Sequence, residues 1–131
     1  MNRLLVVDDD PDIRVLLTLS LDGTGWAVAT ASGGTAALAA CAAGEADALL
    51  LDLEMPGVSG RDVLDSLAGS VPIVVITAFH DPVLVGELLA LGALAVLGKP
   101  FDPARLAGDV AAALGWLTTT PDPPPAPRQA A

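Results

Sequence analysis

The side chains best suited to chemistry are acidic, and each follows an apolar stretch. Asp8 and Asp9 come directly after the apolar run at 3–7, and Asp52 ends the run at 48–51. Carboxylates that converge repel one another, and their pKa values rise unless a cation compensates them. Mg²⁺ is the natural candidate, because it takes hard oxygen ligands and keeps several waters. These residues therefore predict a site for a divalent cation, although Asp52 alone would also suit a turn cap.

Two more polar residues follow apolar runs in the same way. Thr77 lies in the β-branched run at 73–78 and offers a hydroxyl donor, and Lys99, the only lysine, comes soon after the run at 95–97. A carboxylate such as Asp52 can act as a nucleophile toward phosphorus. A cation, an ammonium group and a hydroxyl would then neutralise the phosphoryl oxygens. We therefore expect phosphoryl transfer to Asp52.

Composition and charge exclude several classes of protein. The formal net charge of the 131 residues is −10, and the six basic side chains form no cluster, which argues against direct nucleic-acid binding. No apolar run is long enough to span a membrane, and acidic residues interrupt the N-terminal stretch too early for a secretory signal. We expect a cytoplasmic protein. The lone cysteine, Cys41, is expected to be a small core residue, and the single histidine, His80, to be a loop residue.

Five apolar runs alternate with five helical patterns along the chain. This alternation predicts an α/β fold in which helices cover both faces of a parallel sheet. A flavodoxin-like (βα)5 sandwich with strand order 2-1-3-4-5 would bring the carboxyl ends of the first and third strands together. The predicted strands are 3–7, 26–31, 48–52, 73–78 and 95–97. The predicted helices are 11–21, 35–43 with Ser32 as N-cap, 60–67, 82–91 and 103–117.

The chain is expected to hold one domain, at residues 1–117. This length is sufficient for an ordinary hydrophobic core. Residues 118–131 are rich in proline and have no hydrophobic period. Such composition predicts a disordered tail or a linker.

Four motifs in this order resemble the receiver domain of two-component response regulators. They are VVDDDPDIR, LLLDLEMPGVSG, VITA and GKPF, and the resemblance covers about residues 2–117. It implies that a sensor histidine kinase or a histidine phosphotransfer protein donates a phosphoryl group to Asp52. Such a domain catalyses only its own phosphorylation and dephosphorylation, so it is not an enzyme with a separate substrate.

The resemblance also implies how the metal is held. Asp9, Asp52 and the backbone carbonyl of Glu54 would bind Mg²⁺ directly, and Mn²⁺ is a possible substitute. Asp8 would act through water. Glu54 and Phe79 would line the approach of the attacking water, so an apolar Phe79 predicts slow dephosphorylation, and Phe79→Ala should alter the lifetime of the phosphorylated form.

The remaining family positions concern the phosphoryl group and the switch. Lys99 would contact the phosphoryl group, and the Lys99–Pro100 peptide bond would be cis. Thr77 would swing toward the phosphoryl oxygens. The family usually couples this threonine to an aromatic residue, but Val96 occupies that position here. The resemblance therefore does not extend to the aromatic part of the switch.

The fourth predicted helix is almost entirely apolar, with Glu87 as its single charged residue. Burial of most of this helix is one explanation. The other is a docking surface on the fourth helix, fifth strand and fifth helix, the face that receiver domains use for dimers or effectors. The second explanation predicts at least partial self-association.

Two rival functions stay open at this point. Asp8 and Asp10 fit the DxD pattern of haloacid-dehalogenase-type phosphatases, but that reading leaves Asp52 without a role. A receiver-like interaction module that is never phosphorylated is the other alternative. The complete set of acidic residues with Thr77 and Lys99 argues against it, whereas Val96 leaves it open.

Overall fold

A computed structural model of the chain describes residues 2–78 and 81–117. Phe79 and His80, for which a role in water access and a loop position were predicted, lie outside the described residues, as does the segment 118–131. The described residues form five strands that alternate with five helices. In chain order these are β1 (Arg3–Val7), α1 (Pro11–Ser20), β2 (Ala27–Ala31), α2 (Gly34–Ala42), β3 (Ala48–Asp52), α3 (Gly60–Leu67), β4 (Ile73–Thr77), α4 (Pro82–Ala90), β5 (Ala95–Gly98) and α5 (Pro103–Leu114).

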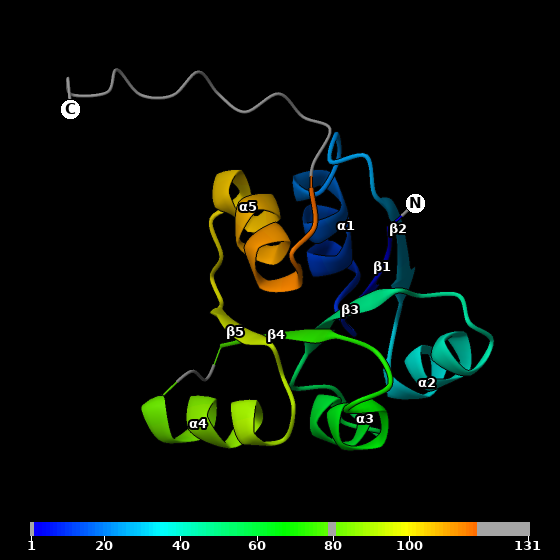
Figure 1. Cartoon of the computed structure of the whole chain (residues 1–131), viewed down its shortest axis with the longest axis vertical. Helices are drawn as coiled ribbons and strands as arrows, with labels where there is room; N and C mark the ends of the chain where they lie inside the picture. The colour runs from blue at the N-terminus through cyan, green and yellow to red at the C-terminus, as the bar shows by residue number, and fades with distance from the viewer. Residues whose placement is uncertain (1, 79–80, 118–131) are drawn as a thin grey trace.

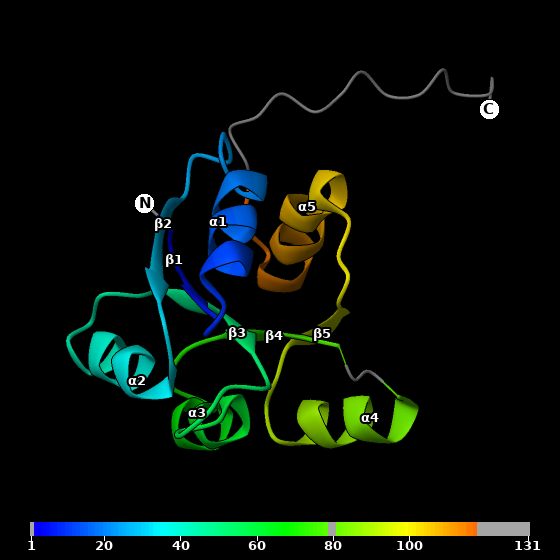
Figure 2. The same cartoon turned by 180° about the vertical axis from the view of Figure 1, so that it is seen from behind.

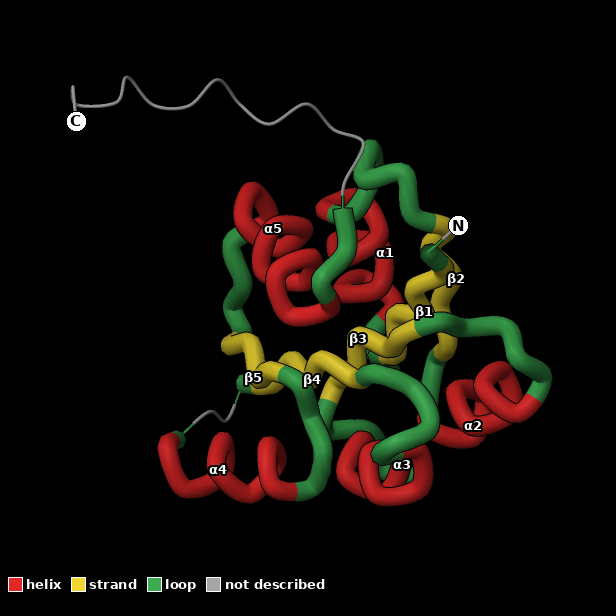
Figure 3. Tube along the Cα trace, viewed as in Figure 1, coloured by secondary structure: helices red, strands yellow, loops and turns green. Residues whose placement is uncertain are grey.

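The strands form one parallel sheet in the order β2-β1-β3-β4-β5. Helices α1 and α5 cover one face of this sheet, and α2, α3 and α4 cover the other (Figures 1 and 2). The same three layers are visible when the chain is coloured by secondary structure (Figure 3). The predicted flavodoxin-like α/β sandwich is therefore confirmed.

The hydrophobic core consists of two clusters, one on each face of the sheet. Leu49 and Leu51 belong to the cluster beneath α2, α3 and α4, whereas Leu50 belongs to the cluster beneath α1 and α5. Side chains alternate between the faces of a strand, so a central strand needs apolar residues at every position. This requirement explains why β3 and β4 are apolar up to their last residues, Asp52 and Thr77, and are buried along their whole length.

Two helix ends differ most clearly from the sequence prediction, and a glycine lies at each of them. The N-cap of α2 is Gly33, not Ser32, and it makes no side-chain capping hydrogen bond. Helix α5 ends at Leu114 instead of Leu117, because Gly115 adopts a left-handed conformation with φ of 69°. Glycine adopts this conformation without a steric penalty and therefore ends helices efficiently.

Helix α4 is much less buried than expected if burial of most of the helix explained its apolar sequence. Leu88 is its one fully buried residue, whereas Val83 and Leu89 are 72% and 45% exposed. The explanation that burial accounts for the apolar character of α4 is therefore wrong. The alternative, a docking surface on this face, stays a prediction. No helix among residues 2–78 and 81–117 is long and apolar enough to cross a membrane.

Candidate functional site

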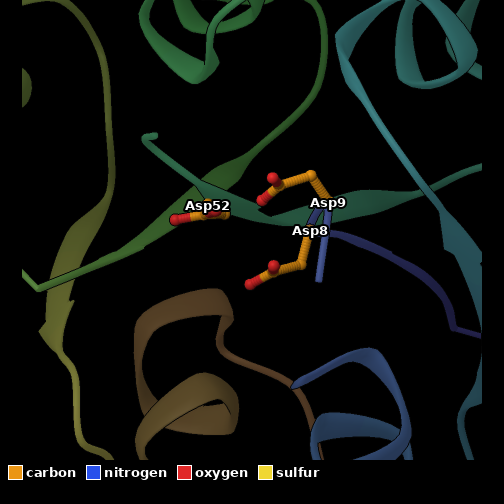
Figure 4. A group of neighbouring side chains, drawn as sticks. All are labelled: Asp8, Asp9 and Asp52. Atoms are coloured by element: carbon orange, nitrogen blue, oxygen red, sulfur yellow. The ribbon is translucent and has the colours of Figure 1, made fainter. Parts of the chain in front are cut away.

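Three carboxylates meet at the carboxyl edge of the sheet. Asp8 and Asp9 follow β1, and Asp52 ends β3. Each can place one oxygen within 4.8 Å of the others (Figure 4). Asp8 and Asp52 are only 1% and 4% exposed, whereas Asp9 is exposed to solvent. The site is therefore open to solvent on the side of Asp9.

Strand pairing explains why residues so far apart in sequence converge. Strands β1 and β3 are neighbours, and Val7 pairs with Leu51. The residues that follow this pair, Asp8 and Asp52, must then lie side by side. The loop after β1 is fixed locally, because Asp8 Oδ1 accepts a 2.9 Å hydrogen bond from the Asp10 backbone N–H. Asp10 in turn is the N-cap of α1, because its carboxylate accepts a 2.9 Å hydrogen bond from a backbone N–H in the first turn of that helix.

Lys99 supplies the positive charge opposite these carboxylates. Its Nζ lies 2.9 Å from Asp8 Oδ2 and 3.2 Å from Asp52 Oδ1. The backbone N–H of Lys99 donates to the carbonyl of Thr77 at 2.9 Å, which continues the β4–β5 pairing to the edge of the sheet. The Lys99–Pro100 peptide bond is cis. Lys99 thus bridges two of the three carboxylates.

The pKa values of Asp52 and Lys99 are both raised above their ordinary values, but for different reasons. Burial raises the pKa of the Asp52 carboxyl group, and the neighbouring charge of Asp8 raises it further; contacts with Lys99 offset this only in part. Burial lowers the pKa of Lys99, but the hydrogen bond to Asp8 and the charges of Asp52 and Asp8 outweigh burial and raise it. A second cation near Asp52 would therefore favour its ionised form.

A pocket of about 280 Å³ opens above the carboxylates. It is bounded by a small set of mostly acidic residues, namely Asp8, Asp9, Asp10, Ile13, Asp52, Glu54, Ala78 and Lys99. This acidic set provides hard oxygen ligands of the kind that Mg²⁺ prefers. The residues present therefore fit a divalent cation. The Asp9 side chain makes no hydrogen bond or ion pair with any described residue, so its carboxylate is available as a ligand.

Thr77 lies at the end of β4 but not in this pocket. It is fully buried, and Ala78 lines the pocket in its place. Val75 and Val96 pair across β4 and β5 and contact the cluster beneath α2, α3 and α4. Thr77 is two residues beyond Val75, so its side chain lies on the same face of the sheet as Val96. The threonine and the valine at the switch-aromatic position thus share one face.

The sequence matches the family model described as the response regulator receiver domain over residues 4–111. The chain belongs to this family. Among curated relatives, the chain is 43% identical over 114 residues to the DNA-binding response regulator MtrA of Mycolicibacterium smegmatis, which covers 86% of this chain and 50% of MtrA. It is 40% identical over 103 residues to the transcriptional regulatory protein KdpE of Mycobacterium tuberculosis, covering 77% and 46%. The chain spans about half the length of these curated relatives.

Solved receiver structures match this chain over nearly their whole length. The response regulator TrrA of Thermotoga maritima, solved in complex with Mg²⁺–BeF, is 34% identical with a TM-score of 0.75, covering 86% of this chain and 99% of that one. Vibrio cholerae CheY4 is 30% identical with a TM-score of 0.79, covering 86% and 98%. The resemblance to receiver domains is confirmed, and the phosphatase alternative is not supported.

One contact in this site was not anticipated from the sequence. The Arg14 guanidinium donates a 2.8 Å hydrogen bond from Nη1 to the backbone carbonyl of Asp8. Arg14 belongs to the VVDDDPDIR motif, and its position six residues after Asp8 was the available signal. Sequence reasoning overlooked it because the acceptor is a backbone atom, which no residue type reveals.

Proposed function

We propose that this receiver domain accepts a phosphoryl group on Asp52 from a sensor histidine kinase or a histidine phosphotransfer protein. The observation that carries the proposal is the shared lysine: Lys99 contacts both Asp8 and Asp52 at the mouth of an acidic pocket. In the transfer, an Asp52 oxygen forms a bond to phosphorus while the bond from phosphorus to the donor histidine nitrogen breaks. Lys99 could then contact the anionic oxygens of the phosphoryl group in addition to its present partners, Asp8 and Asp52.

The proposed cation is Mg²⁺, with Mn²⁺ as a substitute. Asp9, Asp52 and the backbone carbonyl of Glu54 would hold it, and Asp8 would act through water. The contacts of Asp8 support this division, because its Oδ1 and Oδ2 already accept hydrogen bonds from Asp10 and Lys99. When bound, the cation supplies positive charge that neutralises the phosphoryl oxygens. Asp52 stays ionised for attack, although burial alone favours its neutral form.

Phosphorylation would reach partners through Thr77 and the surface formed by α4, β5 and α5. Thr77 must rotate to contact a phosphoryl group, because it does not line the pocket at present. Its neighbour on the same face is Val96, and a valine displaces less volume than a ring. The exposed apolar residues Val83, Leu89 and Leu94 provide a surface for an effector protein or for a second copy. Sedimentation with and without beryllofluoride tests this: monomer under both conditions would remove self-association.

The remaining features of the proposal follow from the family. The domain would occupy residues 1–117, with 118–131 as tail or linker, and it would act in the cytoplasm. It would turn over no substrate beyond its own phosphorylation and dephosphorylation. The curated relatives described as DNA-binding extend well beyond the matched half, and the net charge of −10 supports a domain that does not itself bind nucleic acid.

The decisive experiment exposes the chain to acetyl phosphate and Mg²⁺ and measures intact mass. We expect wild type to gain one phosphoryl group and to lose this ability when the metal is chelated. Asp52→Asn should gain nothing, whereas Asp65→Asn, an exposed aspartate on α3, should behave as wild type. Phosphate on Asp8 would favour the phosphatase alternative. An unmodified wild type that also fails to accept phosphate from any kinase would favour an interaction module.

A further inference from the structure

Arg14 connects the first helix to the strand end that carries the acidic residues. It lies in the first turns of α1, is partly buried, and donates from Nη1 to the carbonyl oxygen of Asp8 at 2.8 Å. We infer that Arg14 is a positioning residue for the cation site: it orients the Asp8–Asp9 backbone so that the Asp9 carboxylate faces Asp52. This inference rests on the proposed metal-dependent function.

The hydrogen bonds of Asp8 show what Arg14 adds. Its N–H donates to the Ala31 carbonyl at 3.2 Å, which ties it to β2. Its two carboxylate oxygens accept from Asp10 and Lys99, both at 2.9 Å. These three contacts fix the amide and the side chain of Asp8. The Arg14 bond is made to the carbonyl, and it therefore constrains the peptide group that joins Asp8 to Asp9.

Asp9 depends on this peptide group more than its neighbours do. Asp8 is buried and hydrogen-bonded, and Asp52 is held at the end of a central strand. Asp9 lies beyond the last paired residue of β1, is exposed, and its side chain has no partner among the described residues. The direction of its carboxylate is thus set mainly by the backbone before it. A charge-assisted hydrogen bond is suited to hold that backbone, because it is stronger than a neutral one.

A charge effect and a positioning effect predict opposite results when Arg14 is neutralised. Arg14 is a permanent cation in contact with the backbone of Asp8, so removing its charge alone should tighten the binding of a divalent cation at the acidic cluster. Loss of positioning should weaken that binding, because residues that orient metal ligands typically contribute about 10-fold to 100-fold in affinity. The sign of the change therefore distinguishes the two roles.

The test is calorimetric titration of Mg²⁺ into wild type, Arg14→Met, Arg14→Lys and Arg105→Met. We expect Arg14→Met to bind Mg²⁺ about 10-fold more weakly, and Arg14→Lys to recover part of the loss because it retains a charged donor. Arg105→Met is the matched control, since it removes an exposed cation from the start of α5 and leaves the hydrogen bond from Arg14 to the Asp8 carbonyl in place. It should bind Mg²⁺ at least as tightly as wild type.

A second measurement needs no metal. Amide hydrogen exchange at Asp9 and Asp10 should be faster in Arg14→Met than in wild type and unchanged in Arg105→Met. If Arg14→Met does not fold, Arg14→Gln replaces it and the same outcomes apply. Equal or tighter Mg²⁺ binding by the neutral variant, with unchanged exchange, would overturn the inference. A wild type that binds no Mg²⁺ would instead overturn the proposed function, so the two failures are distinguishable.

Discussion

Replacing Gly60 with alanine would test how closely α3 is fitted against the strand end that carries Asp52. Gly60 is the first residue of α3, and its N–H donates to the carbonyl of Leu53 at 3.1 Å. A Cβ added there would collide with the carbonyl oxygen of Asp52 and would lie 2.6 Å from Leu53 Cα. These obstructing atoms are backbone atoms, so no side-chain rotation can relieve the contact.

The size of the effect follows from which atoms must move. Overpacking in a close-packed region typically costs about 1–3 kcal/mol. Since the start of α3 or the end of β3 has to shift as a unit, we expect the upper end, about 3 kcal/mol in the free energy of unfolding. In a domain of this size that lowers the melting temperature by about 10 °C. The same shift would displace Asp52, so Mg²⁺ affinity should fall as well.

Gly86→Ala is the matched control for this variant. Gly86 lies inside α4, and an added Cβ would meet no atom within 4 Å. Alanine is the better helix former by about 1 kcal/mol, so this variant should be more stable than wild type. Urea denaturation followed by tryptophan fluorescence measures both. A Gly60→Ala protein within about 0.5 kcal/mol of wild type, the range of ordinary surface changes, would refute the steric reasoning.

Three further predictions concern stability. Burial and the charge of Asp8 raise the pKa of Asp52 from its ordinary 3.8. The Asp52 carboxyl group therefore binds its proton more tightly in the folded state than in the unfolded state, and the free energy of unfolding falls as the pH rises from 3.8 through the raised pKa. Without Mg²⁺ at neutral pH, Asp52→Asn should therefore resist urea better than wild type, and equal or lower resistance would contradict this. Ser59→Ala removes the capping box of α3 and should cost about 1 kcal/mol, whereas Ser66→Ala on the exposed side of that helix should cost less; equal losses in urea denaturation would count against the cap. Trp26→Phe removes the 2.8 Å hydrogen bond from the indole N–H to the Leu117 carbonyl and should cost about 1 kcal/mol by thermal unfolding, and an unchanged melting temperature would show that this bond contributes nothing.

Local chemistry made most of the fold predictable. Apolar runs such as the one ending at Asp52 predict buried strands, because a strand covered by helices on both faces needs apolar residues at every position. The helix ends were less predictable. Ser32 has the side chain of a good N-cap, but α2 begins after Gly33 instead. A Cβ at the next residue, Gly34, would meet Val58, so this helix end is set by a close tertiary contact that the local sequence does not reveal.

The sequence by itself determined which chemical groups lie at the end of which strand: Asp8 and Asp9 at the first, Asp52 at the third, Thr77 at the fourth and Lys99 at the fifth. Only the tertiary structure decided which of these groups touch. Lys99 contacts Asp8 across 91 residues of sequence, and Thr77 is buried outside the pocket. The physical reason is that periodicity and turn chemistry act over a few residues, whereas the distance between two strand ends depends on strand order, register and the face to which each side chain points.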